Sequence, residues 1–336
     1  MNADVCVVGA GPSGAAAAIA LARTGADVLM VGPEKAPPAG TLELLSGHAR
    51  HCLDTLGLTG AVAARAPSCA ATVSRWGGPE FAEQSSVLDP AGPGWVVDRA
   101  WLDPVFLSAA RAAGVRHLRA RVAGAERDGH GWSLHCVDGV AARRISAPRV
   151  IVSSGRTGRV AARFGMRRMT GHRMVAMTTW LPGDPLRLGH RLLIDHAPGG
   201  WWYALPDTEG TSVVYCTDAD LLRPGTWHDA ARHVGWAETL RARHRPVLRA
   251  AVTGRAVTVT GRGVTLVGDA ALAVDPLSGR GLTLALETAL MATRGEGEYR
   301  DWLAEETRAH ERQSRSVYGL VGADDLEFWR RRAAAA

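Results

Sequence analysis

The chain has 336 residues, a formal charge of +6, and a composition that is 46% hydrophobic and 21% charged. This length and composition favour a soluble globular protein with two domains, or with one domain that carries a large insertion. No apolar run is long enough to cross a bilayer, and no basic segment precedes the first apolar run. We therefore expect no integral membrane segment and no secretion signal, and a cytoplasmic location.

The cysteines and the basic residues indicate which metal ions and macromolecules the protein could bind. The five cysteines show no CxxC or other metal-ligand spacing, which predicts reduced packing residues and no metal site. Lys35 is the only lysine, so arginine carries nearly all of the positive charge. Clusters such as Arg167-Arg168 and 330–332 are either solvated faces or a docking surface for an anionic partner. No basic face interleaved with aromatic residues predicts binding to nucleic acid.

A dinucleotide-binding pattern opens the chain. The run Val5–Val8 predicts a strand, and an alanine-rich helix to about Arg23 and a second strand over Asp27–Val31 follow. Between the first strand and the helix lies the turn Gly9-Ala10-Gly11-Pro12-Ser13-Gly14. In such a βαβ unit the first glycine permits a tight turn, the second lets the backbone approach a pyrophosphate, and the third allows close packing of helix on strand.

The end of the second strand departs from this pattern. An acidic residue usually stands there and binds the adenosine ribose, but this chain has Gly32, with Glu34 two residues later. Glu34 either binds the ribose from a bulged turn or is a surface residue.

The middle of the chain alternates between extended and helical patterns. We expect a loop that leads into a helix over residues 40–60, an extended region at 72–76, and a strand that becomes an amphipathic helix over 95–114. The remaining expected elements are strands at 117–123, 131–137 and 149–153, strands and turns over 172–217, a helical stretch over 227–250 and a charged helical tail over 298–332.

A second glycine-rich turn follows a strand near the C-terminal end of the chain. Residues 265–267 lead into Gly268-Asp269, and the sequence PLSGRG at 276–281 precedes a helical run. Glycine turns and helix N-termini gather unpaired N–H groups, so we expect an electron-rich ligand there. Asp269 either accepts hydrogen bonds from ligand hydroxyls or caps a helix. The two turns together suit FAD, with the pyrophosphate at the first turn and the ribityl chain and ring at the second.

Six motifs are spread along the chain: GAGPSG at 9–14, VDRAWLD at 97–103, SSGR at 153–156, GGWWYALP at 199–206, GDAALAVDPLSGRG at 268–281 and FWRRR at 328–332. They resemble those of the p-hydroxybenzoate-hydroxylase-type flavoproteins, and within them the tryptophan-halogenase-like branch. The Trp76-Gly77 segment, the GWWY segment and the FWRRR tail most resemble the flavoprotein monooxygenases of this branch that mature tryptophylquinone cofactors.

The resemblance implies an α/β fold, in which a Rossmann-like FAD-binding domain of the glutathione-reductase type carries an inserted, mainly β substrate domain and a C-terminal helical tail. The expected segments are 1–58, 96–165 and 255–297 for the FAD-binding domain, 59–95 and 166–254 for the substrate domain, and 298–336 for the tail.

The resemblance also implies roles for the residues at matching positions. The three turn glycines bind the ADP half of FAD, Arg99 helps to hold the phosphate–ribityl region, and Asp269 takes the ribityl chain. The expected contacts of the isoalloxazine ring lie from Pro276 to Leu282, and they include Gly279 and Gly281.

Two further sets of residues are candidates for the substrate side. Trp201, Trp202 and Tyr203 either line an aromatic substrate pocket or pack in the core of a strand. His48 and His196 are candidates for a general base, although most histidines are ordinary hydrogen-bonded residues.

The activity implied by the resemblance is hydroxylation of an electron-rich aromatic ring by FAD and O₂ through a flavin C4a-hydroperoxide. The implied substrate is an indole, including a tryptophan residue of a peptide or protein. No second dinucleotide fingerprint is present, so either NAD(P)H visits transiently or a partner flavin reductase supplies the reduced flavin.

Three alternatives stay open. They are a flavin-dependent dehydrogenase or reductase on the same fold, a flavin-dependent halogenase, and a non-catalytic flavin-binding partner protein. Halogenation is disfavoured because halogenases depend on a lysine in the substrate domain, whereas Lys35 follows the second strand. The sequence VSSG at 152–155 also stands where the wider family has an Asp-Ala-Thr/Ser-Gly turn, which removes one expected contact on the flavin side.

Overall fold

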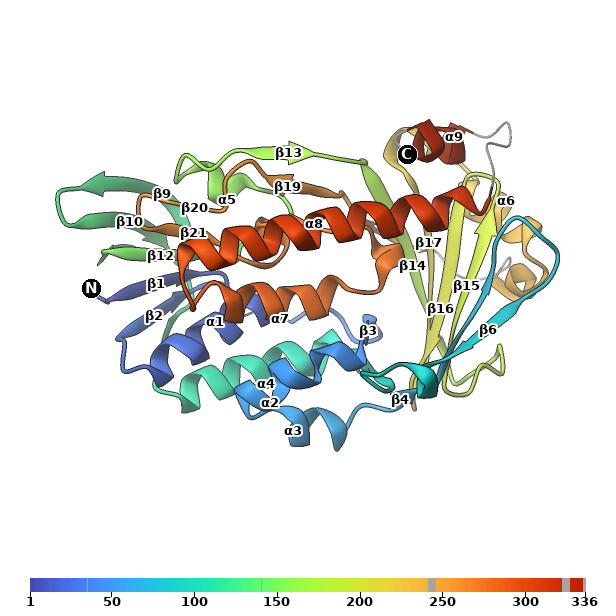
Figure 1. The fold of residues 1–336 in the computed structure, drawn as a ribbon, viewed down its shortest axis with the longest axis horizontal. Coiled ribbons are helices and arrows are strands. Elements are labelled where there is room, and N and C mark those ends of the chain that lie inside the picture. Colours follow the sequence, from blue (N-terminus) through green and yellow to red (C-terminus); the bar gives the residue numbers. More distant parts are fainter. Residues whose placement is uncertain (35, 140, 241–245, 322–326, 335–336) are drawn as a thin grey trace.

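The structure is a computed structural model that describes residues 1–34, 36–139, 141–240, 246–321 and 327–334. A parallel sheet forms one end of the molecule (Figure 1). Its strand order is β20-β21-β12-β1-β2-β8, and every neighbouring pair is parallel except β20 and β21. These strands are β1 Val5–Val8, β2 Val28–Val31, β8 Arg116–Leu118, β12 Arg149–Val152, β20 Thr260–Gly261 and β21 Val264–Leu266. All residues of β1 and β2 are buried, as expected for parallel strands that are covered on both faces.

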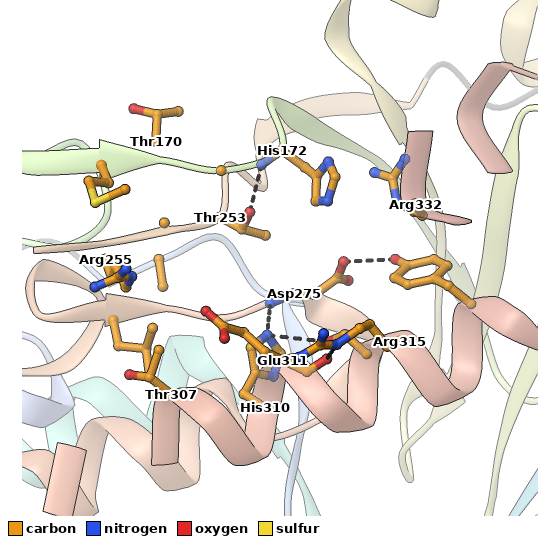
Figure 2. A pocket seen from close by; sticks show the side chains of 17 residues that line it. Thr170, His172, Thr253, Arg255, Asp275, Thr307, His310, Glu311, Arg315 and Arg332 are labelled. Atoms are coloured by element: carbon orange, nitrogen blue, oxygen red, sulfur yellow. Dashed lines mark hydrogen bonds between the residues drawn. The ribbon is translucent and has the colours of Figure 1, made fainter. Parts of the chain in front are cut away.

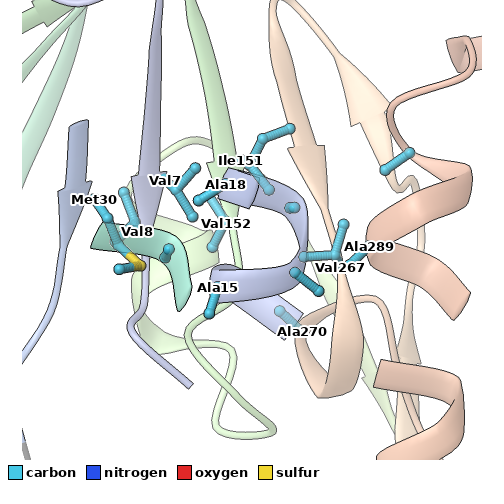
Figure 3. Close-up of a cluster of buried hydrophobic side chains, with 14 of the residues drawn as sticks. Val7, Val8, Ala15, Ala18, Met30, Ile151, Val152, Val267, Ala270 and Ala289 are labelled. Atoms are coloured by element: carbon cyan, nitrogen blue, oxygen red, sulfur yellow. The ribbon is translucent and has the colours of Figure 1, made fainter. Parts of the chain in front are cut away.

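Helix α1 (Pro12–Arg23) lies between α4 (Arg99–Ala112) and α7 (Gly281–Met291) on one face of this sheet (Figure 1). Its buried alanines allow a close approach to β1 and β12, and Figure 3 shows Ala15 and Ala18 among the valines of the sheet. The shorter helices are α2 Arg50–Leu56, α3 Thr59–Ala63 and α5 Arg159–Ala162.

A seven-stranded sheet forms the opposite end of the molecule (Figure 1). Its order is β18-β14-β17-β16-β15-β5-β6, and only the β5–β15 pair is parallel. The strands are β5 Ala71–Arg75, β6 Ala82–Ser85, β14 Met174–Pro182, β15 Arg191–Ala197, β16 Gly200–Pro206, β17 Gly210–Asp218 and β18 Val247–Ala250. One face packs on α6 (Thr226–His233), and the other faces the nucleotide-binding part of the chain.

Three small sheets complete the strands. The antiparallel set β11-β10-β9 covers one end of the parallel sheet, while β3-β7-β4 and β13-β19-β22 lie between the two large sheets (Figure 1). Their bounds are β3 Leu42–Leu45, β4 Ser68–Cys69, β7 Gly94–Asp98, β9 Arg121–Asp128, β10 Gly131–Val137, β11 Ala142–Ala147, β13 Arg168–Thr170, β19 Gly254–Ala256 and β22 Leu272–Ala273.

Two helices end the chain. The long helix α8 (Glu296–Gly319) runs from the parallel sheet toward the seven-stranded sheet, and α9 (Glu327–Ala334) packs on the latter (Figure 1). A buried ion pair, Arg332 Nη2 to Asp218 Oδ1 at 2.8 Å, and a hydrogen bond from the Trp329 indole to the Ala197 carbonyl fix α9 there. None of the helices in the described ranges has the length and apolar character that a membrane span needs.

Most predicted elements are confirmed, including the opening βαβ unit and the strand-to-helix segment at 95–114. Two expectations were wrong. Residues 42–45 form β3 instead of a loop, because they pair with β7. The helical stretch expected over 227–250 forms α6 to His233 and a 3₁₀ helix over Gly235–Leu240, and its part at 241–245 lies outside the described residues. Residues 247–250 are strand β18, paired with β14. The expected fold class, α/β with a largely β insertion and a helical end, is confirmed. The strands of the seven-stranded sheet lie within 71–85 and 174–250, and the division into domains stays a prediction.

Candidate flavin site and adjoining cavities

The first glycine turn is shaped by close backbone contacts. Gly9 has φ of +124°, and a Cβ there would lie 2.4 Å from the carbonyl oxygen of Ser153. A Cβ on Gly14 would lie 2.1 Å from the carbonyl oxygen of Gly9, whereas one on Gly11 would meet no atom within 4 Å. Gly9 and Gly14 are thus required by packing. Gly11 instead keeps space open before the N-terminus of α1, which no side chain caps.

A cavity of about 660 Å³ surrounds this turn, and Gly9, Ala10 and Gly11 line it. Pro12, Ser13 and Gly14 are buried in the first turn of α1 behind it. Glu34 also lines the cavity, and its carboxylate lies 3.0 Å from Arg111 Nη2, whose hydrogen bond holds the pKa of Glu34 below its usual range. The hydroxyl of Ser154 lines the same cavity and is buried without a hydrogen-bond partner in the described structure. The open glycine, an acid and a free hydroxyl fit the pyrophosphate and ribose of the ADP half of FAD.

The glycine at the end of β2 has a packing reason. A Cβ on Gly32 would lie 2.7 Å from the backbone nitrogen of Ala10. An acidic residue therefore cannot stand at position 32 without moving the glycine turn. Glu34 lies on the cavity wall two residues later, and its role at the ribose stays a prediction.

The two carboxylates of the second glycine turn, those of Asp269 and Asp275, make different contacts with the rest of the protein. Asp269 follows β21, and Arg156 bonds to its Oδ2 from Nε at 3.0 Å and from Nη2 at 2.9 Å. Asp275 is the residue that caps, because its Oδ1 accepts from the backbone N–H of Leu277 and its Oδ2 accepts from the Tyr318 hydroxyl at 2.7 Å. The cap role considered for Asp269 thus belongs to Asp275.

A second cavity, of about 220 Å³, lies between this turn and the seven-stranded sheet. Pro276, Gly279, Gly281 and Leu282 line it on the turn side, at the N-terminus of α7. A Cβ on Gly281 would meet no atom within 4 Å, so the helix N-terminus is open toward a ligand. Backbone N–H groups at this position suit the carbonyl edge of an isoalloxazine ring, which becomes electron-rich when it is reduced.

Arg99 connects the two cavities. Its Nε lies 2.6 Å from Asp103 Oδ1, and its Nη1 lies 2.9 Å from Glu43 Oε1. Asp103 lines the larger cavity and Glu43 lines the smaller one. Arg99 itself lines neither cavity, so its contact with the phosphate–ribityl part of FAD stays a prediction. The residues present fit this cofactor, and the individual contacts stay predictions.

The aromatic residues of β16 divide between its two faces. Trp201 and Tyr203 line the smaller cavity, and their rings stack at 5.9 Å. Trp202 points to the other face, where its ring lies 4.8 Å from Tyr215 and 4.8 Å from Trp227. Trp202 is thus a core residue, as strand alternation requires for one of the three.

The two histidines proposed as general bases lie away from these cavities. His48 is an exposed residue, 3.7 Å from Asp89, and His196 Nδ1 lies 3.3 Å from the carbonyl oxygen of Arg75. Neither of them lines a cavity described here. The structure therefore gives no geometric support for a general-base role of either residue.

Two other histidines face a third cavity of about 470 Å³ beneath β13 and β19 (Figure 2). His172 lies beside the strands, and His310 extends from α8, where its Nε2 accepts the backbone N–H of Asp275 at 3.3 Å (Figure 2). Burial lowers the pKa of both imidazoles below the ordinary value of 6.5. Asp275 lines both this cavity and the 220 Å³ cavity, so it forms part of the wall between them.

Sequence reasoning missed several residues that line the smaller cavity. Arg156 belongs to the SSGR motif and could have been found beside Asp269. Asp275 directly precedes Pro276, a position typical of an N-cap. Arg249 gave no signal, because its segment was read as a helix. Lys35 lies outside the described residues. Within those residues no group of three or more His, Cys, Asp or Glu side chains could hold a metal ion.

A parallel sheet with an open glycine turn at the N-terminus of a helix is the arrangement of dinucleotide-binding folds. Residues 2–294 match the model of the FAD binding domain family, and the chain belongs to that family. The menaquinone reductase of Mycobacterium tuberculosis is 31% identical over 330 residues, which cover 87% of this chain and 76% of the reductase. The protein is thus an FAD-dependent oxidoreductase.

One further relative and two solved structures match over nearly the whole chain. A protein named as the FAD-dependent oxidoreductase LodB, from Marinomonas mediterranea, is 24% identical over 366 residues, covering 98% of this chain and 97% of LodB. The flavin-dependent halogenase CmlS is 21% identical with a TM-score of 0.86, covering 99% of this chain and 68% of CmlS. The peptidyl tryptophan dihydroxylase QhpG is 24% identical with a TM-score of 0.78, covering 99% of this chain and 79% of QhpG. These two structures share the fold.

Proposed function

We propose that the protein is an FAD-dependent monooxygenase that hydroxylates an electron-rich aromatic ring, and that this ring is the indole of a tryptophan residue in a peptide or protein. The observation that carries the proposal is the 220 Å³ cavity between the second glycine turn and the aromatic face of β16. A flavin ring at the turn would lie opposite this aromatic face, where the substrate ring would stack on Tyr203.

The walls of this cavity supply what such a reaction needs from the protein. Tyr203 offers a flat surface against which an aromatic ring can stack, and the fully buried Trp201 stacks on Tyr203 and supports it. Leu192, Leu205 and Leu282 exclude water from the same space. Bound FAD would supply the activation of O₂, and the chain would orient the substrate ring and keep the site dry.

The name of one neighbour supports the choice of substrate. QhpG, which shares the fold, is a peptidyl tryptophan dihydroxylase. The similarity to LodB over nearly the full length of both chains is consistent with the sequence resemblance to flavoproteins that mature tryptophylquinones. A tryptophan side chain also matches the aromatic wall that Trp201 and Tyr203 form.

The test is isotopic labelling of a peptide. The FAD-loaded protein would be reduced, exposed to ¹⁸O₂ and incubated with tryptophan-containing peptides, including segments of proteins encoded beside it. We expect ¹⁸O on the tryptophan ring by mass spectrometry, and loss of the label with the Tyr203→Ala variant. Reduced flavin that is oxidised without any label on an aromatic ring would contradict the proposal. Running the reaction with NADH alone and with an added flavin reductase would identify the electron donor.

A reductase is the second candidate, because the relative at 31% identity is named a menaquinone reductase. This reading predicts reduction of a double bond without O₂ and without ¹⁸O in the product. Anaerobic turnover with a menaquinone analogue would favour the reductase.

A further inference from the structure

One cation in the 220 Å³ cavity has no carboxylate partner. Arg249 extends from the edge strand β18, its Nη2 donates to the Thr41 hydroxyl at 3.3 Å, and its Nε is buried with no hydrogen-bond partner in the described structure. It forms no ion pair with a carboxylate in the described ranges. The Arg249 side chain as a whole is half-buried, but its buried Nε donor is unfavourable unless a ligand acceptor reaches it.

The other charged groups in the wall of this cavity are already neutralised or bonded. Arg156 pairs with Asp269 at 2.9 Å. Glu43 pairs with Arg99 at 2.9 Å. Both oxygens of Asp275 accept hydrogen bonds from the protein. Arg249 is therefore the charged group of this wall that is left for a ligand.

Strand register fixes how Arg249 lies relative to the aromatic wall. Arg249 pairs across the sheet with Ala176, Ala176 with Cys216, and Cys216 with Trp201. All four line the cavity, so they form one row on the same face of the sheet. Neighbouring strands lie about 4.8 Å apart, which puts the backbones of Arg249 and Trp201 about 14 Å from each other. Cys216 and Trp201 are fully buried, at 0% and 1% exposure, so Arg249 and Ala176 are the members of this row that offer surface to a ligand, beside the partly buried Tyr203.

We propose that Arg249 binds a carboxylate of the substrate while the substrate's aromatic ring lies over Ala176, against Tyr203. This inference rests on the proposed function and narrows its substrate to an aromatic ring with a carboxylate attached nearby. The carboxylate comes either from a free aromatic acid or from an acidic residue beside the tryptophan of a peptide. Hydrogen bonds from a guanidinium to a carboxylate are charge-assisted and strong, so they discriminate against a neutral amide of the same shape.

Binding without turnover tests this inference separately from the reaction. Calorimetric titration of the oxidised FAD-loaded protein would compare indole-3-propionate with indole-3-propionamide. It would also compare a capped peptide containing Glu-Trp with its Gln-Trp counterpart. We expect the acid of at least one pair to bind about tenfold or more tightly than its amide. Preference within the first pair identifies a free acid, and preference within the second identifies a peptide. Equal affinities in both pairs would overturn the inference.

Variants assign any preference to Arg249. Arg249→Gln should remove the preference for the acid, Arg249→Lys should keep part of it, and Arg300→Gln, a change at an exposed arginine on α8, should leave it intact. The FAD content and melting temperature of each variant would verify that it folds. The inference would be overturned if Arg249→Gln still preferred the acid to the amide, including the case in which this variant changes the flavin spectrum but not the preference. Acid-selective binding without oxygen transfer would instead contradict the proposed function alone.

Discussion

The two walls of the flavin site are built in different ways. At the first glycine turn the wall is backbone: a Cβ on Gly9 would lie 2.4 Å from the Ser153 carbonyl oxygen, and one on Gly14 would lie 2.1 Å from the Gly9 carbonyl oxygen. At the seven-stranded sheet the wall is made of side chains, and alternation along β16 decides which of them face the cavity. A change in the first wall moves the chain itself, whereas a change in the second alters only what the cavity can accept.

This difference explains how each region tolerates variation. A dinucleotide presents the same pyrophosphate in every flavoprotein, so a rigid backbone cradle suits it. A substrate differs from one enzyme to the next, and a sheet face can change its pocket by side-chain substitution without losing its hydrogen-bond ladder. Matched substitutions within each wall can test this account.

The largest effect is expected at the glycine turn. The Gly14→Ala variant should fail to fold or should lose more than the about 1–3 kcal/mol typical of an overfilled core, because its methyl group would lie against the Gly9 carbonyl oxygen. Gly11→Ala is the matched control, since its methyl group meets no protein atom. It should fold with a near-normal melting temperature and bind FAD at least about tenfold more weakly. Thermal unfolding and flavin absorbance measure both quantities, and normal FAD affinity in Gly11→Ala would argue against a pyrophosphate at this turn.

On the sheet, substitutions at two neighbouring residues of β16 should affect different properties, stability in one case and substrate binding in the other. Trp202→Ala removes a fully buried ring that packs on Tyr215 and Trp227, so it should lower the free energy of unfolding by about 3–5 kcal/mol. Tyr203→Ala changes the cavity face and should cost less stability while it weakens substrate binding. Denaturant unfolding and ligand titration separate the two effects. Equal losses of stability would show that Tyr203 is part of the core rather than of a substrate wall.

The difference between the backbone wall and the side-chain wall also determines how much of the site can be predicted from the sequence. The opening βαβ unit and both glycine turns follow from local spacing, because each needs only consecutive residues with special backbone requirements. The reason for Gly32 lies in Ala10, which is close in space but not in sequence, so the missing acid at the strand end looked like a defect.

The substrate wall depends on pairing between strands that are far apart in the chain. Arg249 lies in the same row as Trp201 only because β18 pairs with β14, β14 with β17 and β17 with β16, a register that no local pattern specifies. The histidines show the same limit. His172 and His310 share a cavity because α8 packs beneath β13 and β19, whereas His48 and His196 had only their residue type in favour of a catalytic role.

The smallest predicted effect concerns these two histidines and pH. Burial, together with the positive charges of Arg332 near His172 and Arg280 near His310, lowers their pKa values in the folded state. The unfolded chain therefore binds more protons just below the ordinary pKa of 6.5, and stability should fall as the pH drops through that window. The double variant His172→Gln/His310→Gln should lose less melting temperature on acidification than the wild type, whereas His130→Gln, at an exposed site, should behave like the wild type. Identical pH profiles for all three proteins would mean that the cavity between α8 and β13 admits a protonated imidazole without cost, and that it is more open to water than the buried turn beside it.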